Sequence, residues 1–193
     1  MPDTPCPDPQ TDPDADKPEE IVWQGQYLTA KRRGRWEYAS RARGIRAAAI
    51  LAVEDGHVLL VEQYRLPLAQ VCLEIPAGLI GDEGDSEEDA MAAARRELEE
   101  ETGYRADRWE NLGDFFSSPG MVSESFTLLR ASGLTRIGPG GGVEGENITV
   151  HRVPLAGLAD FVSGRREAGI GIDVRIAMLL LTQKLGENGW QDA

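Results

Sequence analysis

The sequence predicts an α/β protein in which a mixed β-sheet lies between helices, with a small extension of β-strands before it. Segments that alternate apolar and polar residues, as strands do, are interspersed with segments whose apolar residues recur at helical spacing. The two kinds of segment follow each other in mixed order and without an internal repeat, which is typical of a sheet covered by helices on both faces.

The composition is that of a globular protein of one substantial domain. Of the 193 residues, 41% are hydrophobic and 27% are charged, which are ordinary values. The longest apolar run, residues 47–53, is far shorter than the roughly 18 residues of a membrane span. Because the N-terminus has neither a basic start nor an apolar segment, we expect no signal peptide and no membrane partner.

The net charge bears on the kind of partner, and the cysteines bear on the cellular compartment. A formal net charge of −13 repels phosphate backbones, so nucleic acid is not expected as a partner. It does not exclude a small phosphorylated substrate, because a bound divalent cation can reverse the local charge. Cys6 and Cys72 form neither a disulfide framework nor a zinc pattern, and two reduced thiols favour the cytoplasm.

Three regions are expected along the chain. Residues 1–20 are rich in Pro and Asp, cannot bury a core, and are predicted to be a disordered tail. Residues 21–42 alternate apolar and polar residues and predict two or three short strands. Such a small sheet must bury its apolar face against something. Residues 43–193 form the main domain.

The main domain begins with a hairpin, in which Asp55-Gly56 is the turn between two strands. A glycine-rich loop spans residues 138–146. Helices are expected at about 154–164 and 172–185, and strands at 45–53, 57–64, 71–75, 109–116, 124–131 and 147–153.

A further helix carries most of the chemistry. We expect it to begin at Ser86 as N-cap, with Asp89 three residues later, and to end at Gly103. On a helical projection its apolar face carries Met91, Ala94 and Leu98, and the adjacent sector carries Glu97, Glu100 and Glu101, whereas Glu99 points away.

The three carboxylates of this sector repel each other if nothing compensates them. A solvated acidic face is one interpretation of the pattern. A bound cation such as Mg²⁺ is the other, because Mg²⁺ prefers oxygen ligands.

The string from Arg96 to Tyr104 resembles the Nudix box, R-E-U-x-E-E-x-G-U with U apolar. Matching residues are Arg96, Glu97, Leu98, Glu100, Glu101 and Gly103. Glu88 stands at the expected place of the first glutamate, with Glu87 and Asp85 as alternatives. Asp82 occupies the position of the leading glycine.

Neighbouring segments resemble the ADP-ribose pyrophosphatase-like branch of the Nudix hydrolase family, so that the resemblance covers roughly residues 45–185. They are Glu62-Gln63-Tyr64-Arg65, Glu74-Ile75-Pro76-Ala77-Gly78-Leu79, the segment 118–124 and the acidic loop 144–148. The resemblance implies the Nudix fold and a Mg²⁺-dependent hydrolase, with Mn²⁺ as a substitute, that converts ADP-ribose to AMP and ribose 5-phosphate. One alternative is another nucleoside diphosphate sugar, such as GDP-mannose. A non-catalytic nucleotide-sensing domain is a second alternative, and an acidic scaffolding protein is a third.

The resemblance also implies roles for individual residues. Glu97 and Glu101 would bind the metal, with Glu100 assisting and the Ala77 carbonyl completing the site. Arg96 would orient these carboxylates. The substrate would contact Arg65, Glu74, Glu124 and Gly78.

A glutamate of the loop would be the general base, with Glu144 favoured over Glu146 and with Glu100 or Glu124 as the next candidates. Because glycines leave the loop 138–146 little restraint, we expect it to be poorly ordered or turned away from the carboxylates without substrate. In this branch the N-terminal strands imply a homodimer.

Overall fold

The structure is a computed structural model that describes residues 12–81 and 89–188, with side chains as far as residue 181. The chain forms two compact units. The first comprises the chain up to residue 46 together with residues 115–126, and the second comprises residues 47–114 and the chain from residue 127 onwards. Each unit is described by itself.

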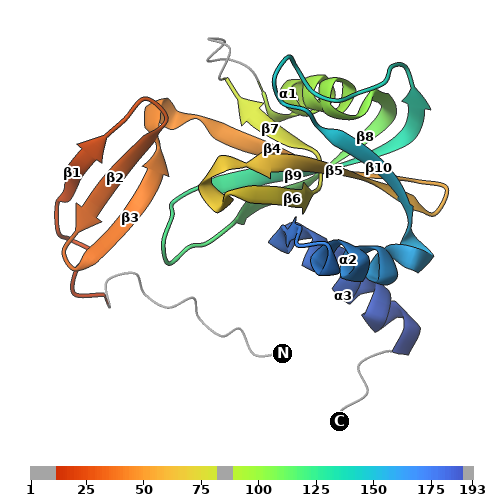
Figure 1. The fold of residues 1–193 in the computed structure, drawn as a ribbon. Coiled ribbons are helices and arrows are strands. Elements are labelled where there is room, and N and C mark those ends of the chain that lie inside the picture. Colours follow the sequence, from red (N-terminus) through yellow and green to blue (C-terminus); the bar gives the residue numbers. More distant parts are fainter. Residues whose placement is uncertain (1–11, 82–88, 189–193) are drawn as a thin grey trace. The chain divides into compact units, whose positions relative to one another are not determined.

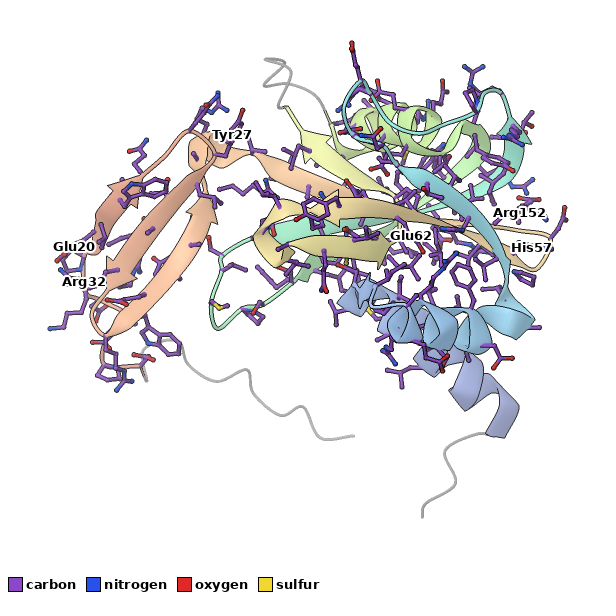
Figure 2. The ribbon with its side chains drawn as sticks, in the orientation of Figure 1. Glu20, Tyr27, Arg32, His57, Glu62 and Arg152 are labelled. Carbon is purple, nitrogen blue, oxygen red and sulfur yellow. The ribbon has the colours of Figure 1, made fainter. Side chains whose placement is uncertain are left out.

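The first unit contains a three-stranded antiparallel sheet of β1 (Glu19–Gln24), β2 (Leu28–Arg33) and β3 (Trp36–Arg41). The expectation of disorder through residue 20 is wrong at its end, because β1 begins at Glu19. Two ion pairs join the start of β1 to β2: Glu19 lies 2.8 Å from Lys31, and Glu20 accepts a hydrogen bond of 2.7 Å from Arg32. Figure 2 labels Glu20 and Arg32, which face each other across the two strands.

The second unit is built on a mixed sheet, whose order is β11-β6-β5-β4-β9-β8, with β10 added beside β5 and β7 beside β4. β11 runs parallel to β6, whereas β5 is antiparallel to β4, β6 and β10. The predicted hairpin turn is confirmed, since Asp55 and Gly56 both have positive φ. The strands are β4 (Arg46–Glu54), β5 (His57–Arg65), β6 (Gln70–Glu74), β7 (Ala77–Ile80), β8 (Tyr104–Phe116), β9 (Ser125–Arg136), β10 (Thr149–Pro154) and β11 (Gly171–Ile172).

Helices cover both faces of this sheet, as predicted. Figure 1 shows α1 (Ala90–Glu97) on one side, and α2 (Leu158–Glu167) and α3 (Val174–Asn188) on the other. In the part of the chain that the structure describes, no helix is long and apolar enough to span a membrane.

α1 is fixed to the sheet by small and apolar side chains. Ala93, Ala94 and Leu98 are fully buried and belong to one core cluster with Ile50, Leu59 and Leu129. Removing the Leu98 side chain would cost about 2–5 kcal/mol, the usual range for a buried leucine. This packing fixes the rotation of the helix, and therefore the direction of its glutamates.

The start of this helix and the conformation of its last turn differ from the prediction. Asp89, and not Ser86, is the N-cap, because its side chain accepts a hydrogen bond of 2.7 Å from the Ala92 amide. Ser86 and the candidates for the first glutamate of the box lie outside the described residues. At the other end, residues Leu98–Thr102 form a π-helical turn that the sequence did not predict, and Gly103 ends it with a φ of 72° as expected.

Candidate functional site

Glu101 is the most deeply buried of the predicted metal-binding acids, with 4% of its surface exposed. The Ala77 amide donates a hydrogen bond of 3.1 Å to its carboxylate, so that β7 and the π-helical turn meet here. Burial, together with the negative charges of Glu97 and Glu146, raises the pKa of Glu101 to about 8. The Ala77 hydrogen bond and the charge of Arg65 act in the opposite direction without cancelling that shift.

Glu97 lies against the backbone of β7. A Cβ atom on Gly78 would overlap the Glu97 carboxylate, so glycine is required there by close approach. Arg96 donates to Glu97 at 2.8 Å and to Glu100 at 3.3 Å, and its second nitrogen donates to the Leu79 carbonyl at 3.3 Å. Arg96 therefore ties both carboxylates to β7, as its expected orienting role requires.

Glu99 points away from this group, as the helical projection predicts. It accepts two hydrogen bonds from Arg105, of 2.7 and 3.1 Å, on the exposed side of the helix. The described structure thus separates Glu99 from Glu97 and Glu101, although all three belong to one short string.

Arg65 and Glu74 form a bidentate pair. The Arg65 guanidinium donates to the two Glu74 oxygens at 2.5 and 2.9 Å, and Glu74 is buried. The strand β5, which ends at Arg65, packs against the π-helical turn, and the charge of Arg65 lowers the pKa of Glu101. The structure therefore brings together the two expected substrate contacts, Arg65 and Glu74, and the expected metal ligands.

The glycine-rich loop is held onto the end of this helix, so the expectation of a loop turned away is wrong. Gly141 donates to the Glu101 carbonyl at 2.8 Å, Gly142 to the Glu100 carbonyl at 3.0 Å, and Gly138 to the Gly103 carbonyl at 3.1 Å. The last carbonyls of a helix have no partner within the helix, and the loop amides satisfy them.

Glycines make this close approach possible. A Cβ on Gly103 would overlap the backbone of the loop, and one on Gly140 would overlap the backbone at Thr102. The glycines that predicted a flexible backbone therefore allow the loop to pack closely against the helix.

Within the loop, Glu146 differs from Glu144 in its hydrogen bond and in its effect on Glu101. The Glu146 carboxylate accepts a hydrogen bond of 3.0 Å from the Val143 amide, and its charge raises the pKa of Glu101. Glu144 and Glu146 are both exposed, and only the charge of Glu146 is among the causes of that shift. The choice between the two acids as general base stays a prediction.

Glu124, another expected contact, belongs to the first unit. There it forms an ion pair of 2.5 Å with Arg41, and the neighbouring Ser123 shares a hydrogen bond of 2.6 Å with Ser40. Its place in the active site stays a prediction.

Two further groups of charged residues were not predicted. Arg175, at the start of α3, donates to Glu74 at 3.2 Å. Glu62 on β5, labelled in Figure 2, lies 2.9 Å from Arg165 and 3.3 Å from His151. No local motif identifies these partners, because they are far apart in the chain.

The oxygen donors at the π-helical turn fit a divalent cation. Glu101 is buried, and its pKa of about 8 reflects a negative charge that burial and neighbouring acids oppose. A hard cation would supply the missing compensation. Among the described residues, no three acidic, histidine or cysteine side chains converge closely enough to enclose an ion as they stand. The candidates for the first glutamate of the box are not among the described residues.

Comparison with known proteins decides the family. Residues 42–167 match the model of the NUDIX domain. The chain belongs to the Nudix family. This match includes the carboxylate helix, Arg65, Glu74 and the glycine-rich loop.

Several named relatives share this domain. The chain is 42% identical to the methanol dehydrogenase activator of Bacillus methanolicus, and 47% of each chain is covered. It is 41% identical to the ADP-ribose pyrophosphatase of Bacillus subtilis (strain 168), over 46% of each chain. It is 31% identical to the GDP-mannose pyrophosphatase of Cronobacter sakazakii (strain ATCC BAA-894), over 72% of each chain. The first two matches thus span about half the length of those relatives.

A solved structure described as an ADP compounds hydrolase matches with a TM-score of 0.65 and 25% identity, covering 89% of this chain and 94% of the other. The predicted Nudix fold is confirmed, and so is the resemblance to the ADP-ribose pyrophosphatase-like branch of this family.

Proposed function

We propose that this protein hydrolyses the diphosphate of ADP-ribose to AMP and ribose 5-phosphate, with Mg²⁺ as cofactor and Mn²⁺ as a substitute. The observation that carries the proposal is the buried Glu101 carboxylate, held by the Ala77 amide beside Glu97 and near Arg65. A group of acids next to an arginine suits an anionic substrate that arrives with a divalent cation.

The metal would be held by Glu97 and Glu101, with Glu100 assisting and the Ala77 carbonyl as a further oxygen ligand. When bound, it would neutralise the diphosphate oxygens and make water more acidic. Arg96 keeps Glu97 and Glu100 in place through its hydrogen bonds.

The protein's own groups supply the remaining steps. Arg65 donates to the diphosphate oxygens, which its planar guanidinium matches. The Glu146 carboxylate takes the proton from the attacking water, because it is the loop acid whose charge reaches Glu101. The water oxygen bonds to one phosphorus while the bridging oxygen leaves with the other phosphate. Negative charge on that leaving group is stabilised electrostatically within the site.

A second candidate substrate is a different nucleoside diphosphate sugar, such as GDP-mannose. A relative at 72% coverage carries the name GDP-mannose pyrophosphatase. The carboxylate helix acts on the diphosphate and does not select the base, so it suits both substrates. A non-catalytic sensing domain would not need these carboxylates, all of which are present here.

The remaining proposals concern the oligomeric state, the cellular compartment and the partners of the protein. We infer a homodimer and a cytoplasmic protein with a small-molecule partner, and neither nucleic acid nor a membrane as partner. Burial raises the pKa of the Cys72 thiol to about 11, which keeps it protonated and inert. A net charge of −13 opposes binding to nucleic acid.

A substrate panel tests the proposed function. Purified protein with Mg²⁺ is assayed against ADP-ribose, GDP-mannose, other nucleoside diphosphate sugars, dinucleotides and nucleoside triphosphates. We expect the highest kcat/KM for ADP-ribose. A higher value for GDP-mannose would favour the second candidate, and the absence of turnover with every substrate would favour a sensing domain.

A further inference from the structure

Arg175 is linked to Arg65 through one buried carboxylate. Its guanidinium donates to Glu74 at 3.2 Å and to the two Asp173 oxygens at 2.7 and 3.0 Å. Glu74 also accepts both hydrogen bonds from Arg65. Only 15% of the Arg175 side chain and 5% of the Glu74 side chain are exposed, so this connection lies inside the protein.

Arg65 is the outer member of this chain of contacts, with 40% of its side chain exposed. In residues 12–81 and 89–181, no acceptor takes a hydrogen bond from its Nη1 atom. Arg65 can therefore bind an anion with this nitrogen while Glu74 holds the other two.

We propose that Arg175 is a positioning residue for substrate binding, because it fixes Glu74 and so holds Arg65 in the orientation that receives the diphosphate. The proposal rests on the proposed function. It goes beyond it by making the start of α3 part of the substrate site, although Arg175 itself is buried behind Glu74.

The charges of the four residues explain the expected effect. Arg65 and Arg175 balance Glu74 and Asp173. Without Arg175, the Asp173 carboxylate loses the arginine that it pairs with. The Glu74 carboxylate would also lose one of its two cations, and a buried carboxylate left with one partner is less firmly fixed. Binding should weaken, whereas the reacting atoms are untouched.

The experiment is a double-mutant cycle on ADP-ribose hydrolysis with Arg65→Met, Arg175→Met and the double variant. We expect each single change to raise KM about tenfold with kcat within about twofold, the scale of one lost charge-assisted contact. We expect the double variant to match Arg65→Met alone, because Arg175 acts through Arg65.

Two further variants keep the test decisive. Arg165→Met removes a half-buried arginine that pairs with Glu62 instead of Glu74, and it should leave KM unchanged. Arg175→Lys keeps the charge but cannot hold both carboxylates, so KM should rise only about threefold. If Arg175→Met does not fold, Arg175→Lys takes its place in the cycle.

Additive increases in the double variant, or a fall in kcat at constant KM, would overturn the proposal. If the wild-type protein hydrolyses none of the panel, the proposed function fails, and the same variants are compared by calorimetric binding of ADP. A coupled loss of ADP affinity would then still support the positioning role, and independent losses would overturn it.

Discussion

At the scale of single residues, the site depends on acids that are held apart from solvent. Glu101 is buried among negative charges, yet it is linked by one hydrogen bond to a backbone amide. Such a group destabilises the protein unless it is protonated or compensated. Burying these like charges lowers the free energy of unfolding, which is a common cost of a reactive site.

The pKa of Glu101 predicts how stability depends on pH. Since this pKa is raised from 4.5 to about 8, the folded state binds more protons than the unfolded state between these values. Stability therefore falls as pH rises through that window. Without divalent cations, we expect the free energy of unfolding of the wild type to fall by about 2–4 kcal/mol more than that of Glu101→Gln between pH 5 and pH 8.

Urea unfolding of both proteins in EDTA, at the two pH values, measures this difference. Titrations common to both proteins cancel in it. Parallel pH dependence of the wild type and Glu101→Gln would show that Glu101 ionises normally.

The two sides of the helix predict unequal effects of neighbouring substitutions. Glu97→Gln should reduce kcat at least a hundredfold, because Glu97 would hold the metal that stabilises negative charge on the leaving phosphate. Glu99→Gln is the matched control, since Glu99 pairs with Arg105 on the exposed side, and we expect a change within about twofold. A severe loss in Glu99→Gln, measured by steady-state kinetics, would show that the site lies on the other side of the helix.

At the scale of elements, the loop and the carboxylate helix behave as one substructure. Backbone hydrogen bonds from Gly141 and Gly142 hold the loop to the carbonyls of Glu101 and Glu100. The base would then be positioned before substrate binds, which lowers the entropy cost of the reaction.

This docking predicts which loop acid matters more. Glu146→Gln should lower kcat about a hundredfold or more with little change in KM, because a general base acts on water and not on binding. Glu144→Gln is the matched control in the same loop and should be nearly unchanged. The reverse order of the two kcat values would return the role to Glu144.

Local patterns in the sequence were sufficient to predict the elements with strong periodicity. The hairpin at Asp55-Gly56, the helical phase of Glu97 and Glu101, and the end at Gly103 follow from spacing and turn chemistry alone. Arg65 and Glu74 were identified as site residues only through resemblance, and their pairing with each other was not predicted.

What was missed depends on contacts between distant segments. The short strands β7 and β11 exist because neighbouring strands pair with them, and the π-helical turn has no known local signal in this sequence. The glycines of the loop predicted a flexible backbone. In the structure they allow close packing, and tertiary hydrogen bonds hold the loop to the helix. Arg175 reaches Glu74 across 101 positions of sequence, a distance that no local pattern spans.

At the scale of the whole molecule, the first unit exposes many apolar side chains. Ile21, Trp23 and Tyr27 are each more than half exposed, and Trp36 is 46% exposed. A small sheet with such a surface is typical of an interaction site.

We therefore predict a homodimer whose interface includes this sheet. Light scattering at micromolar concentration should give twice the chain mass of 21.0 kDa. Trp36→Glu should shift the protein toward monomer, because a charge in an apolar interface is costly to bury. The control Leu66→Glu changes a side chain that is 79% exposed in the short 3-10 helix after β5, and it should leave the mass unchanged. A monomeric wild type would refute the prediction.

We expect the acids of the π-helical turn to make this chain a cation-dependent diphosphate hydrolase. The test is the release of AMP and ribose 5-phosphate from ADP-ribose, followed by chromatography while Mg²⁺ is removed with EDTA and then restored. We predict that release stops with EDTA, resumes with Mg²⁺, and is lost in Glu101→Gln at every Mg²⁺ concentration. Undiminished release in EDTA, or by folded Glu101→Gln, would contradict the claim.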